Sequence, residues 1–466
     1  FLAEGDTITF SFDVTVTDAN GAFTTQTVTM TINGTNDAPV ITPSPDDEAG
    51  EVIEAGVQPG GNTAEPGVMM VQGDLDATDP DSGDTQTWSF APQASVYGTF
   101  SIDPATGEWT YTLNDSSDNN SPVNQLAFGE SVTETYTVTV TDSNGDTDTQ
   151  DVVITITGTN DIPELTVTNS GSVTEDSIDL QPDRLVATGD ITTFDVDNND
   201  VLTLSASYNS DINWLNGAMA VLTAQQISDI IDGFSLDNDD MGWTYNIDND
   251  LVNFLAEGDT ITFSFDVTVT DANGAFDTET VTITINGGND APQVVAATPV
   301  TVSEEGLDNG IIDDIGTPTD VTNLKTDTGT ITFTDSDAPD SNVFTLSLAG
   351  PSTDMYSNGV LVSWSWNSNT NTLTGSANGT PVMTIVLGAV SSGLSGFEAT
   401  YTVNLLDNID HPLNDVEDIL TFNFGVTIND GTQDVITNFD VTIEDDAPVD
   451  EVDELAQNII PHVVGS

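Results

Sequence analysis

The sequence contains no cysteine and few basic residues: Lys and Arg together number 2, against 78 Asp and Glu among 466 residues. Without cysteine, disulfides and a thiol nucleophile are excluded, so any stapling must come from bound metal. The formal net charge of −76 excludes nucleic acid and anionic membrane surfaces as partners. No apolar run approaches the ~18 residues of a membrane span, so we expect no membrane insertion in this segment.

Histidine is equally scarce, since the sequence contains only His411 and His462. Neither stands in the spacing of a zinc site or of a catalytic triad. Carboxylate pairs occur throughout the chain, so none of them marks an acid and base pair. No motif joins a nucleophile to its base, and we predict that the protein is not an enzyme.

The remaining composition indicates a folded chain. Hydrophobic residues make up 37% of the sequence, and Val, Ile, Thr, Phe and Tyr alternate with polar residues as they do in strands. The acidic residues stand at fixed offsets around these runs, which argues against a disordered acidic chain. Their excess indicates either a halophile-like surface or a need for divalent cations as counter-charge.

Repetition defines the organisation of the chain. The stretch FLAEGDTITFSFDVTVTDANGAF occupies residues 1–23 and returns unchanged at residues 254–276. Strands end in GTNDAPV, GTNDIPEL, GGNDAPQV and EDDAPVD, whose prolines mark linkers between domains. Residues 1–37 match only the closing third of a domain and have no opposite sheet to bury their apolar side chains. The predicted units are residues 1–38 (a partial, truncated β-sandwich repeat), 39–161 and 162–291 (β-sandwich repeats), 292–450 (a divergent β-sandwich) and 451–466 (an acidic tail or linker).

Hairpins and one helix can be placed inside these units. Residues 97–115 predict two strands joined by the turn DPATG, and residues 134–158 predict a second hairpin. In TAQQISDIIDGF, Thr223 and Gln226 have the spacing of a capping box. Gly233 follows the apolar residues of this helix and fits a C-cap.

Three phrases, YGTFSIDPATGEWTYTLND, FGESVTETYTVTVTDSNG and GTNDAP, resemble the VCBS and cadherin-like repeats of giant RTX adhesins that Gram-negative bacteria export by type I secretion. The resemblance covers residues 1–291, and residues 405–448 are similar to another repeat of these adhesins. The acidity is similar to that of marine members, including the ice-binding adhesin type. The resemblance implies an all-β fold of tandem cadherin- or Ig-like β-sandwich domains in a linear array, and the helix pattern above adds one short helix in the second full domain.

Carboxylate and Asn side chains recur at strand ends and linkers, where Ca²⁺ finds oxygen ligands. The D-x-D spacing brings two carboxylates together, and a shared cation relieves their repulsion. Alternatively, Asx-rich turns only solvate loop tips. The resemblance implies convergence of such groups on calcium at domain junctions, so Ca²⁺ is the predicted cofactor. The candidate metal ligands are Asn36, Asp37, Glu54, Asp79, Asp81, Asp142, Asn160, Asp161, Glu175, Asp195, Asp197, Asp271, Asn289, Asp290, Glu304, Asp335, Asp337 and Asp445.

The divergent unit contains candidate ligand-binding residues. Trp364 and Trp366 are two apart in a predicted strand and therefore share a face. Either both fill the core, or both face outward and stack on a sugar or grip a peptide side chain. Tyr356, Asp410 and His411 stand in nearby loops. The alternative for His411 is a loop histidine paired to a neighbouring Asp.

Together these features predict a calcium-stabilised segment of a bacterial cell-surface adhesin, extracellular and exported by type I secretion. Calcium would remove hinge freedom at the linkers and turn the domains into a monomeric rod. The extender domains would project a ligand-binding domain for cell adhesion or biofilm formation, with a peptide or glycan of a host or neighbouring cell as partner. The alternative is a structural stalk or surface-layer spacer with no ligand of its own.

Overall fold

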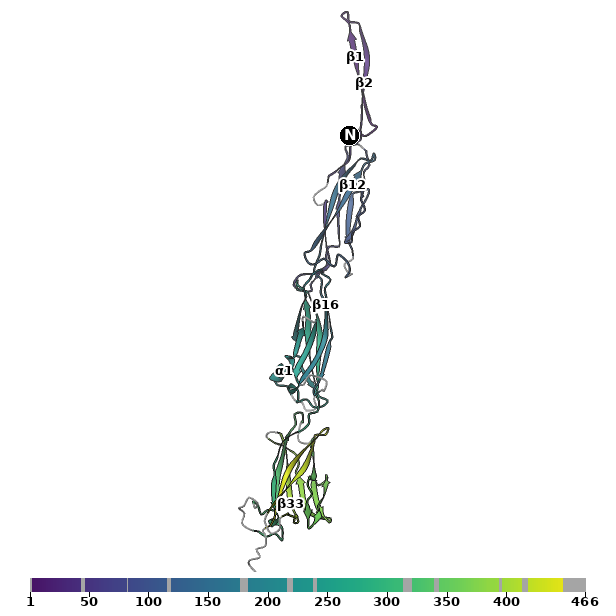
Figure 1. Cartoon of the computed structure of the whole chain (residues 1–466). Coiled ribbons are helices and arrows are strands. Elements are labelled where there is room, and N and C mark those ends of the chain that lie inside the picture. Colours follow the sequence, from purple (N-terminus) through teal and green to yellow (C-terminus); the bar gives the residue numbers. More distant parts are fainter. Residues whose placement is uncertain are drawn as a thin grey trace, which may run out of the picture.

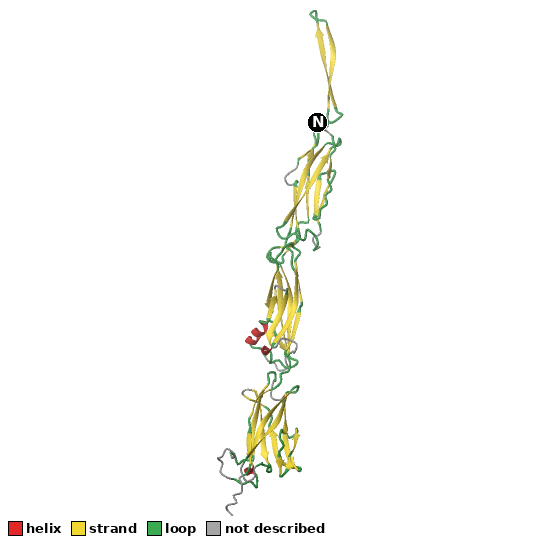
Figure 2. Cartoon of the chain, in the orientation of Figure 1, coloured by secondary structure: helices red, strands yellow, loops and turns green. Residues whose placement is uncertain are grey.

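The computed structural model describes residues 2–42, 47–81, 83–114, 119–176, 183–215, 221–237, 241–312, 321–338, 343–393, 396–412 and 418–446. Within these residues the chain forms β-structured units that follow one another end to end (Figure 1). Strands far outweigh helices (Figure 2), so the predicted all-β fold is confirmed. The predicted acidic tail, including His462, lies outside the described residues. The predicted domain boundaries stay a prediction.

The first unit is a single hairpin of β1 (Thr7–Thr17) and β2 (Phe23–Asn33), paired antiparallel. The strands alternate apolar and polar residues, yet both faces are exposed to solvent. Phe12 is 56% exposed and Met30 is 51% exposed. In the described part of the chain, no opposite sheet covers this hairpin, as expected for residues that match only the end of a domain.

The first sandwich packs two sheets around a core that contains Trp109, Tyr111 and Ile154. The sheets have the strand orders β4-β13-β12-β9 and β10-β11-β7, beside the two-stranded pairs β3-β8 and β5-β6. Its strands are β3 (Val40–Ile41), β4 (Ala49–Ile53), β5 (Gly56–Val57), β6 (Ala64–Glu65), β7 (Met70–Asp74), β8 (Ala77–Thr78), β9 (Thr87–Phe90), β10 (Gly98–Ile102), β11 (Glu108–Leu113), β12 (Ser131–Thr141) and β13 (Thr147–Thr157).

The second sandwich repeats this plan around Trp243, Tyr245 and Phe263. Its sheets have the orders β14-β16-β20-β19 and β15-β22-β21-β17, and β18 also pairs with β21. Its elements are β14 (Glu164–Val167), β15 (Ser170–Thr174), β16 (Arg184–Phe194), β17 (Thr203–Tyr208), β18 (Asn213–Leu215), α1 (Ala224–Ile231), β19 (Phe234–Asp237), β20 (Gly242–Asp248), η1 (Asn249–Leu251), β21 (Thr260–Thr270) and β22 (Phe276–Asn286).

The third sandwich has a larger sheet, in the order β23-β25-β33-β31-β30-β29 with β32 on β33, packed on the sheet β24-β35-β34-β26; β27 pairs with β28. Its core contains Phe333, Tyr401 and Phe424. Its elements are β23 (Gln293–Ala297), β24 (Val300–Ser303), η2 (Glu304–Gly306), β25 (Thr326–Thr334), β26 (Thr345–Pro351), β27 (Tyr356–Ser357), β28 (Val360–Leu361), β29 (Ser363–Asn367), β30 (Thr372–Ala377), β31 (Thr380–Leu387), β32 (Ser391–Gly393), β33 (Gly396–Leu405), β34 (Ile419–Asn429) and β35 (Asp434–Glu444).

Each sandwich pairs an early strand parallel to its last strand: β4 with β13, β15 with β22 and β24 with β35. In the first sandwich Ile53, the end of β4, lies opposite Thr157, the end of β13. The residue after the early strand therefore lies beside the linker that leaves the last strand. In the three sandwiches this residue is Glu54, Glu175 and Glu304.

Helix α1 begins as its sequence predicts. Thr223 Oγ1 accepts a hydrogen bond from the backbone N–H of Gln226, and Gln226 Oε1 accepts one from the backbone N–H of Thr223. Ile230 is buried in the core, and its carbonyl accepts a hydrogen bond of 3.0 Å from the Tyr245 hydroxyl. The capping box determines where the helix starts. The buried Ile230 side chain and the hydrogen bond from Tyr245 hold the helix on the sandwich.

The end of α1 differs from the expectation for a glycine C-cap. The C-cap is Asp232, in the right-handed helical region, and Gly233 does not adopt a positive φ. Packing explains the glycine instead, because a Cβ at Gly233 would overlap the side chain of Ile247.

Candidate metal sites at the ends of the sandwiches

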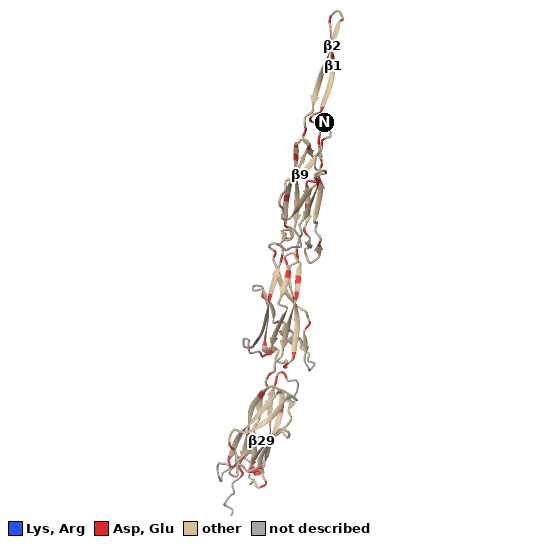
Figure 3. Cartoon of the chain, turned by 90° about the vertical axis from the view of Figure 1, so that its right-hand side faces the viewer, with Lys and Arg blue, Asp and Glu red and all other residues tan. Residues whose placement is uncertain are grey.

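The topology brings acidic residues from distant parts of the sequence together at each junction. In the second sandwich Asp195 and Asp197 directly follow β16, and Asp271 lies in the turn between β21 and β22. This turn lies at the opposite end of the last strand from the following linker, so it faces the preceding linker, where Asn160 and Asp161 stand. Figure 3 shows Asp and Glu distributed along the whole length of the chain, including the connections between units.

The described residues form three junction clusters and a terminal cluster. The first contains Asn36, Asp37, Asp79, Asp81, Asp84 and Asp142; the second Glu54, Asn160, Asp161, Asp195, Asp197, Asp200 and Asp271; the third Glu175, Asn289, Asp290, Asp335, Asp337 and Asp430; and the terminal cluster, at the end of the third sandwich, Glu304, His411, Asp418, Asp445 and Asp446. Every predicted metal residue therefore lies in one of these clusters, although its role as a ligand stays a prediction.

An Asn-to-Asp hydrogen bond ties each linker to the last hairpin of the sandwich that follows. The Nδ2 donor and Oδ2 acceptor join Asn36 to Asp142 at 2.8 Å, Asn160 to Asp271 at 2.7 Å and Asn289 to Asp430 at 3.1 Å. In the second cluster, Asp271 Oδ1 also accepts bonds from the backbone N–H groups of Asn273 and Ala275, at 2.8 and 2.9 Å. One carboxylate thus shapes the turn and holds the linker.

The D-x-D carboxylates are each held through one oxygen. Asp195 Oδ1 accepts a hydrogen bond of 2.9 Å from the backbone N–H of Asp197, and Asp197 Oδ2 accepts one of 2.9 Å from that of Asp161. The first junction cluster repeats both bonds, at 2.8 and 2.9 Å, with Asp79, Asp81 and Asp37. Asx turns explain these bonded oxygens, and they leave the second oxygen of each carboxylate to be explained.

These second oxygens, and further carboxylate and amide oxygens of the junction clusters, are buried and have no hydrogen-bond partner among the described residues. The atoms concerned include Asp79 Oδ2, Asp81 Oδ1, Asn160 Oδ1, Asp161 Oδ2, Asp195 Oδ2, Asp197 Oδ1, Asp200 Oδ2, Asp290 Oδ2 and Asp335 Oδ2. Burying a polar atom without a partner is costly, so such atoms require an explanation. Carboxylate and amide oxygens from flexible loops are the donor set that Ca²⁺ takes, with six to eight ligands. The residues present therefore fit calcium.

Basic side chains do not supply the counter-charge at these clusters. Arg184 pairs with Asp248, and Lys325 lies 3.8 Å from Asp308. Since these are the two Lys and Arg residues of the sequence, the junction carboxylates depend on hydrogen bonds, protons or bound cations for neutralisation.

Burial and mutual repulsion raise the pKa of four carboxyl groups of the second cluster, those of Glu54, Asp161, Asp195 and Asp197. Burial, followed by repulsion from Asp161 and Asp197, raises the pKa of Glu54 to about 9. Burial and the Asp195 charge raise the pKa of Asp161 to about 7, and burial is also the main cause that raises the pKa of Asp197 to about 7. A divalent cation would reverse this balance.

A contact without carboxylates also crosses the second junction. The loop between β5 and β6 reaches the β21–β22 turn, where Gly60 N–H donates to the Asn273 carbonyl at 2.7 Å. Asn62 Nδ2 donates to the Phe276 carbonyl at 2.7 Å, and the Phe276 N–H donates back to Asn62 Oδ1 at 2.9 Å. We call Gly60 and Asn62 with their partners the junction clasp.

The predicted ligand residues occupy different environments. Trp364 and Trp366 are partly buried against the core of the third sandwich, and Trp364 meets the Phe424 ring edge-on at 5.0 Å. This arrangement agrees with the core alternative. Tyr356 is 43% exposed, and its carbonyl accepts a 2.8 Å hydrogen bond from the Asp410 backbone N–H. Ligand binding by these residues stays a prediction.

His411 does not extend that surface, because its side chain is 3% exposed. It pairs with Asp418 instead of the Asp beside it in the sequence, and it belongs to the terminal cluster. The chain runs out through β34 and back through β35, which brings Asp445 beside His411 and Asp418; the local spacing did not indicate this third member.

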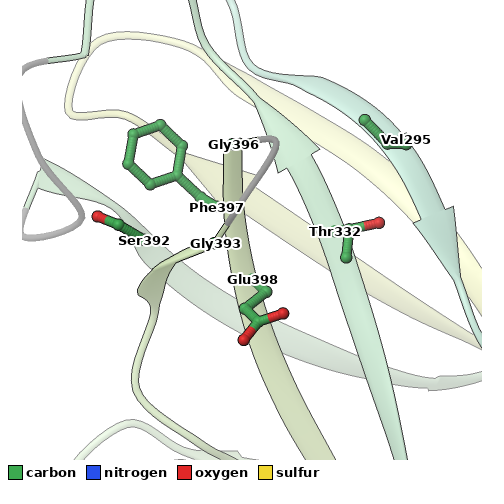
Figure 4. Close-up of a pocket in the computed structure, with 7 residues that line it drawn as sticks. All are labelled: Val295, Thr332, Ser392, Gly393, Gly396, Phe397 and Glu398. Atoms are coloured by element: carbon green, nitrogen blue, oxygen red, sulfur yellow. The ribbon is translucent and has the colours of Figure 1, made fainter.

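A cavity of about 580 Å³ in the third sandwich is lined by Val295, Thr332, Ser392, Gly393, Gly396, Phe397 and Glu398. Figure 4 shows these residues spread around an open concavity, with Glu398 as its charged group. None of the predicted ligand residues lines it.

Asp430 is a cluster member that sequence reasoning missed. It lies in the β34–β35 turn, the position that Asp142 and Asp271 occupy in the other sandwiches. The signal was present, since TINDGT follows an alternating strand as TVTDSNG and TVTDANG do.

The comparison with family models agrees with the fold of the first sandwich. Residues 36–158 match the model of the bacterial cadherin-like domain. The matched segment starts at the linker Asn36 and ends just after β13, so it contains the first sandwich. The prediction that the protein is not an enzyme stays a prediction. No curated protein sequence matches the chain.

Solved cadherin ectodomains are similar at low identity. A PcdhgB3 EC1-4 structure is 12% identical, with a TM-score of 0.38 over 95% of this chain and 84% of that one. A mouse cadherin-23 EC22-24 structure is 13% identical, with a TM-score of 0.34 over 88% and 99%. A Drosophila N-cadherin EC1-4 structure is 15% identical, with a TM-score of 0.28 over 94% and 83%. Among the described residues, no helix is long and apolar enough to cross a membrane.

Proposed function

We propose that this chain is a calcium-stabilised stalk segment of a bacterial cell-surface adhesin. The observation that carries the proposal is the recurrent junction cluster, in which a linker Asn binds a turn Asp while neighbouring carboxylates bury unpaired oxygens. A bound Ca²⁺ would supply positive charge and six to eight coordination positions at each junction.

At the second junction the ligands would come from both neighbours. Glu54 belongs to the first sandwich, Asn160 and Asp161 to the linker, and Asp195 and Asp197 to the second sandwich. An ion held by all three parts would restrict bending about the linker, because bending would break metal–oxygen bonds. A row of such junctions makes a stiff rod from separate domains.

Export by type I secretion and an extracellular, surface-attached location belong to the same proposal. The resemblance of the repeat motifs to those of exported adhesins supports them. In a low-calcium cytosol the junction carboxylates would repel one another, and external calcium would then order the chain after export.

A structural spacer is the version that the third sandwich favours over a ligand module. Trp364 and Trp366 are partly buried against the core, so less of their surface is available to contact a sugar or a peptide. Retention of the whole chain on target cells in Ca²⁺, and its release by a chelator, would instead support a ligand-binding role in adhesion or biofilm formation.

The test combines thermal unfolding with small-angle X-ray scattering on the full chain, in millimolar Ca²⁺ and in EDTA. We expect EDTA to lower the melting temperature and to replace a rod-like profile by that of a flexible chain. The double variant Asp195→Asn and Asp197→Asn should lose most of the calcium effect at its junction. The matched control is Asp151→Asn, since Asp151 is an exposed carboxylate that accepts from the Thr137 hydroxyl on the sandwich surface.

Unchanged melting and scattering in EDTA would refute the proposal. The clusters would then be solvated turns on a highly charged surface, and their unpaired oxygens would require another partner.

A further inference from the structure

The terminal cluster differs from the junction clusters in containing a histidine. His411 and Glu304 are almost fully buried, with side chains 3% and 1% exposed. Glu304 is held in place by two 2.6 Å hydrogen bonds, from the Ile409 backbone N–H to Oε1 and from Asn408 Nδ2 to Oε2. The carboxylate therefore has a fixed orientation next to the imidazole.

Asp418 determines which nitrogen of His411 is available. His411 Nδ1 pairs with Asp418 Oδ1, and because a carboxylate accepts hydrogen bonds, Nδ1 carries the proton. In the neutral ring Nε2 then has a free lone pair. This atom is buried and has no hydrogen-bond partner among the described residues. A carboxylate that orients a histidine in this way is the usual support of a metal-binding imidazole.

Carboxylate oxygens surround this imidazole. His411 Nε2 lies 3.7 Å from Glu304 Oε1. Glu304, Asp445 and Asp446 each offer an oxygen within 4.8 Å of one another, and Asp445 also groups with His411 and Asp418. A cation ~2.1 Å from both Nε2 and Oε1 would see them at an angle of roughly 120°, compatible with the open tetrahedral geometry of zinc sites.

We propose that the terminal cluster binds a divalent first-row transition metal of the Zn²⁺ class, with His411 Nε2, Glu304 and Asp445 as ligands and Asp418 as positioning residue. The donor type decides the metal, since Ca²⁺ takes oxygen ligands whereas imidazole suits Zn²⁺, Cu²⁺ and Ni²⁺. The described junction clusters contain oxygen donors and no histidine. The chain would thus carry two classes of metal site.

The test is calorimetric titration of the full chain with ZnCl₂ in a large excess of Ca²⁺, which occupies the oxygen-only sites. We expect wild type to bind one equivalent of Zn²⁺. His411→Ala should weaken this binding by at least about 100-fold, because even loss of a supporting residue costs about 10–100-fold. Asp418→Asn should fall in that smaller range.

The matched control is His462→Ala, since His462 is the other histidine of the sequence; this variant should bind Zn²⁺ like wild type. Nitrogen-15 NMR of the histidine side chains reports the site in wild type, where only two imidazoles contribute. Zn²⁺ should shift one Nε2 signal, which His411→Ala removes, so a folding defect in the variant cannot imitate the result.

Absence of Zn²⁺ binding in excess Ca²⁺, equal affinities of wild type and His411→Ala, or Zn²⁺ binding with both imidazole signals unmoved would each overturn the inference. Its fate is separate from that of the calcium proposal. Zinc binding without any calcium-dependent stiffening would support this site and refute the stalk mechanism. Calcium-dependent stiffening without zinc binding would support the stalk mechanism and refute this site.

Discussion

Asn160 offers the sharpest test of how a junction cluster works. Its side chain is completely buried. Nδ2 donates to Asp271 Oδ2 at 2.7 Å and to the Asp161 carbonyl at 3.0 Å, while Oδ1 has no hydrogen-bond partner in the part of the chain that the structure describes. The two sides of one amide therefore separate two contributions, a pair of hydrogen bonds and a candidate metal ligand.

Asn160→Ala should destabilise the second sandwich to different extents in EDTA and in Ca²⁺. In EDTA the variant loses a hydrogen bond to a carboxylate, worth about 1.5–3 kcal/mol, and one to a carbonyl, worth about 0.5–1.5 kcal/mol. The expected loss is thus about 2–4.5 kcal/mol. In Ca²⁺ the loss should be larger, because each tenfold weakening of calcium binding removes a further ~1.4 kcal/mol under excess calcium.

The assay is urea unfolding followed by hydrogen exchange of peptides from the second sandwich, with and without Ca²⁺. Asn209→Ala is the matched control, since Asn209 Nδ2 donates at 2.9 Å to both Asp266 and Ser264 on β21. Its loss should be the same in both conditions. If Asn160→Ala also shows equal losses in Ca²⁺ and EDTA, Asn160 Oδ1 is not a calcium ligand and the reasoning fails.

Three further predictions concern pH, the junction clasp and the core. In metal-free protein the folded pKa of Glu54, about 9, lies above its ordinary 4.5, so the contribution of this group to stability is complete below pH ~4.5 and is lost as pH rises through 9. Urea titrations in EDTA should therefore show the free energy of unfolding falling over this window, and a rise would contradict the assigned burial of Glu54. Asn62→Ala removes both hydrogen bonds to the Phe276 backbone, worth about 1 kcal/mol each. Single-molecule FRET in EDTA should then report a wider range of motion than in wild type at the second junction and an unchanged range at the third. Gly189→Ala would place a Cβ in contact with the Trp243 indole and should lower the free energy of unfolding of the second sandwich by about 1–3 kcal/mol. An unchanged calorimetric transition of this sandwich would show that its core rearranges to accept the methyl group.

Local features were predictable from the sequence because they rest on neighbours in the chain. The capping box of α1 and the turn between β10 and β11 follow from residue types at fixed spacings. The prediction for Gly233 was wrong in detail, because the constraint comes from Ile247, on a strand that is close only in the folded sandwich. The same limit applied to His411, whose partner Glu304 is distant in the sequence and lies at the end of β24.

The junction clusters combine both kinds of information. The sequence predicted acidic residues at the strand ends, because Asp and Asn are disfavoured within a half-buried strand. Only the folded chain decides which of them meet, as Asn160 meets Asp271 across 111 positions and Asn289 meets Asp430 across 141. Parallel pairing of an early strand with the last strand is the step that carries Glu54 to the linker.

The duplicated stretch separates the two contributions most directly. Residues 1–23 and 254–276 are identical, and both form a hairpin in the same register, with Thr7 opposite Asn33 and Thr260 opposite Asn286. Alternation and the turn residues determine that hairpin wherever the sequence occurs. Burial is not local, because it requires strands from elsewhere in the chain: Phe12 is 56% exposed, whereas its counterpart Phe265 is 7% exposed against the second sandwich core. The sequence by itself determined strand, turn and register, and the tertiary structure alone decided which face became a core and which carboxylates became a site.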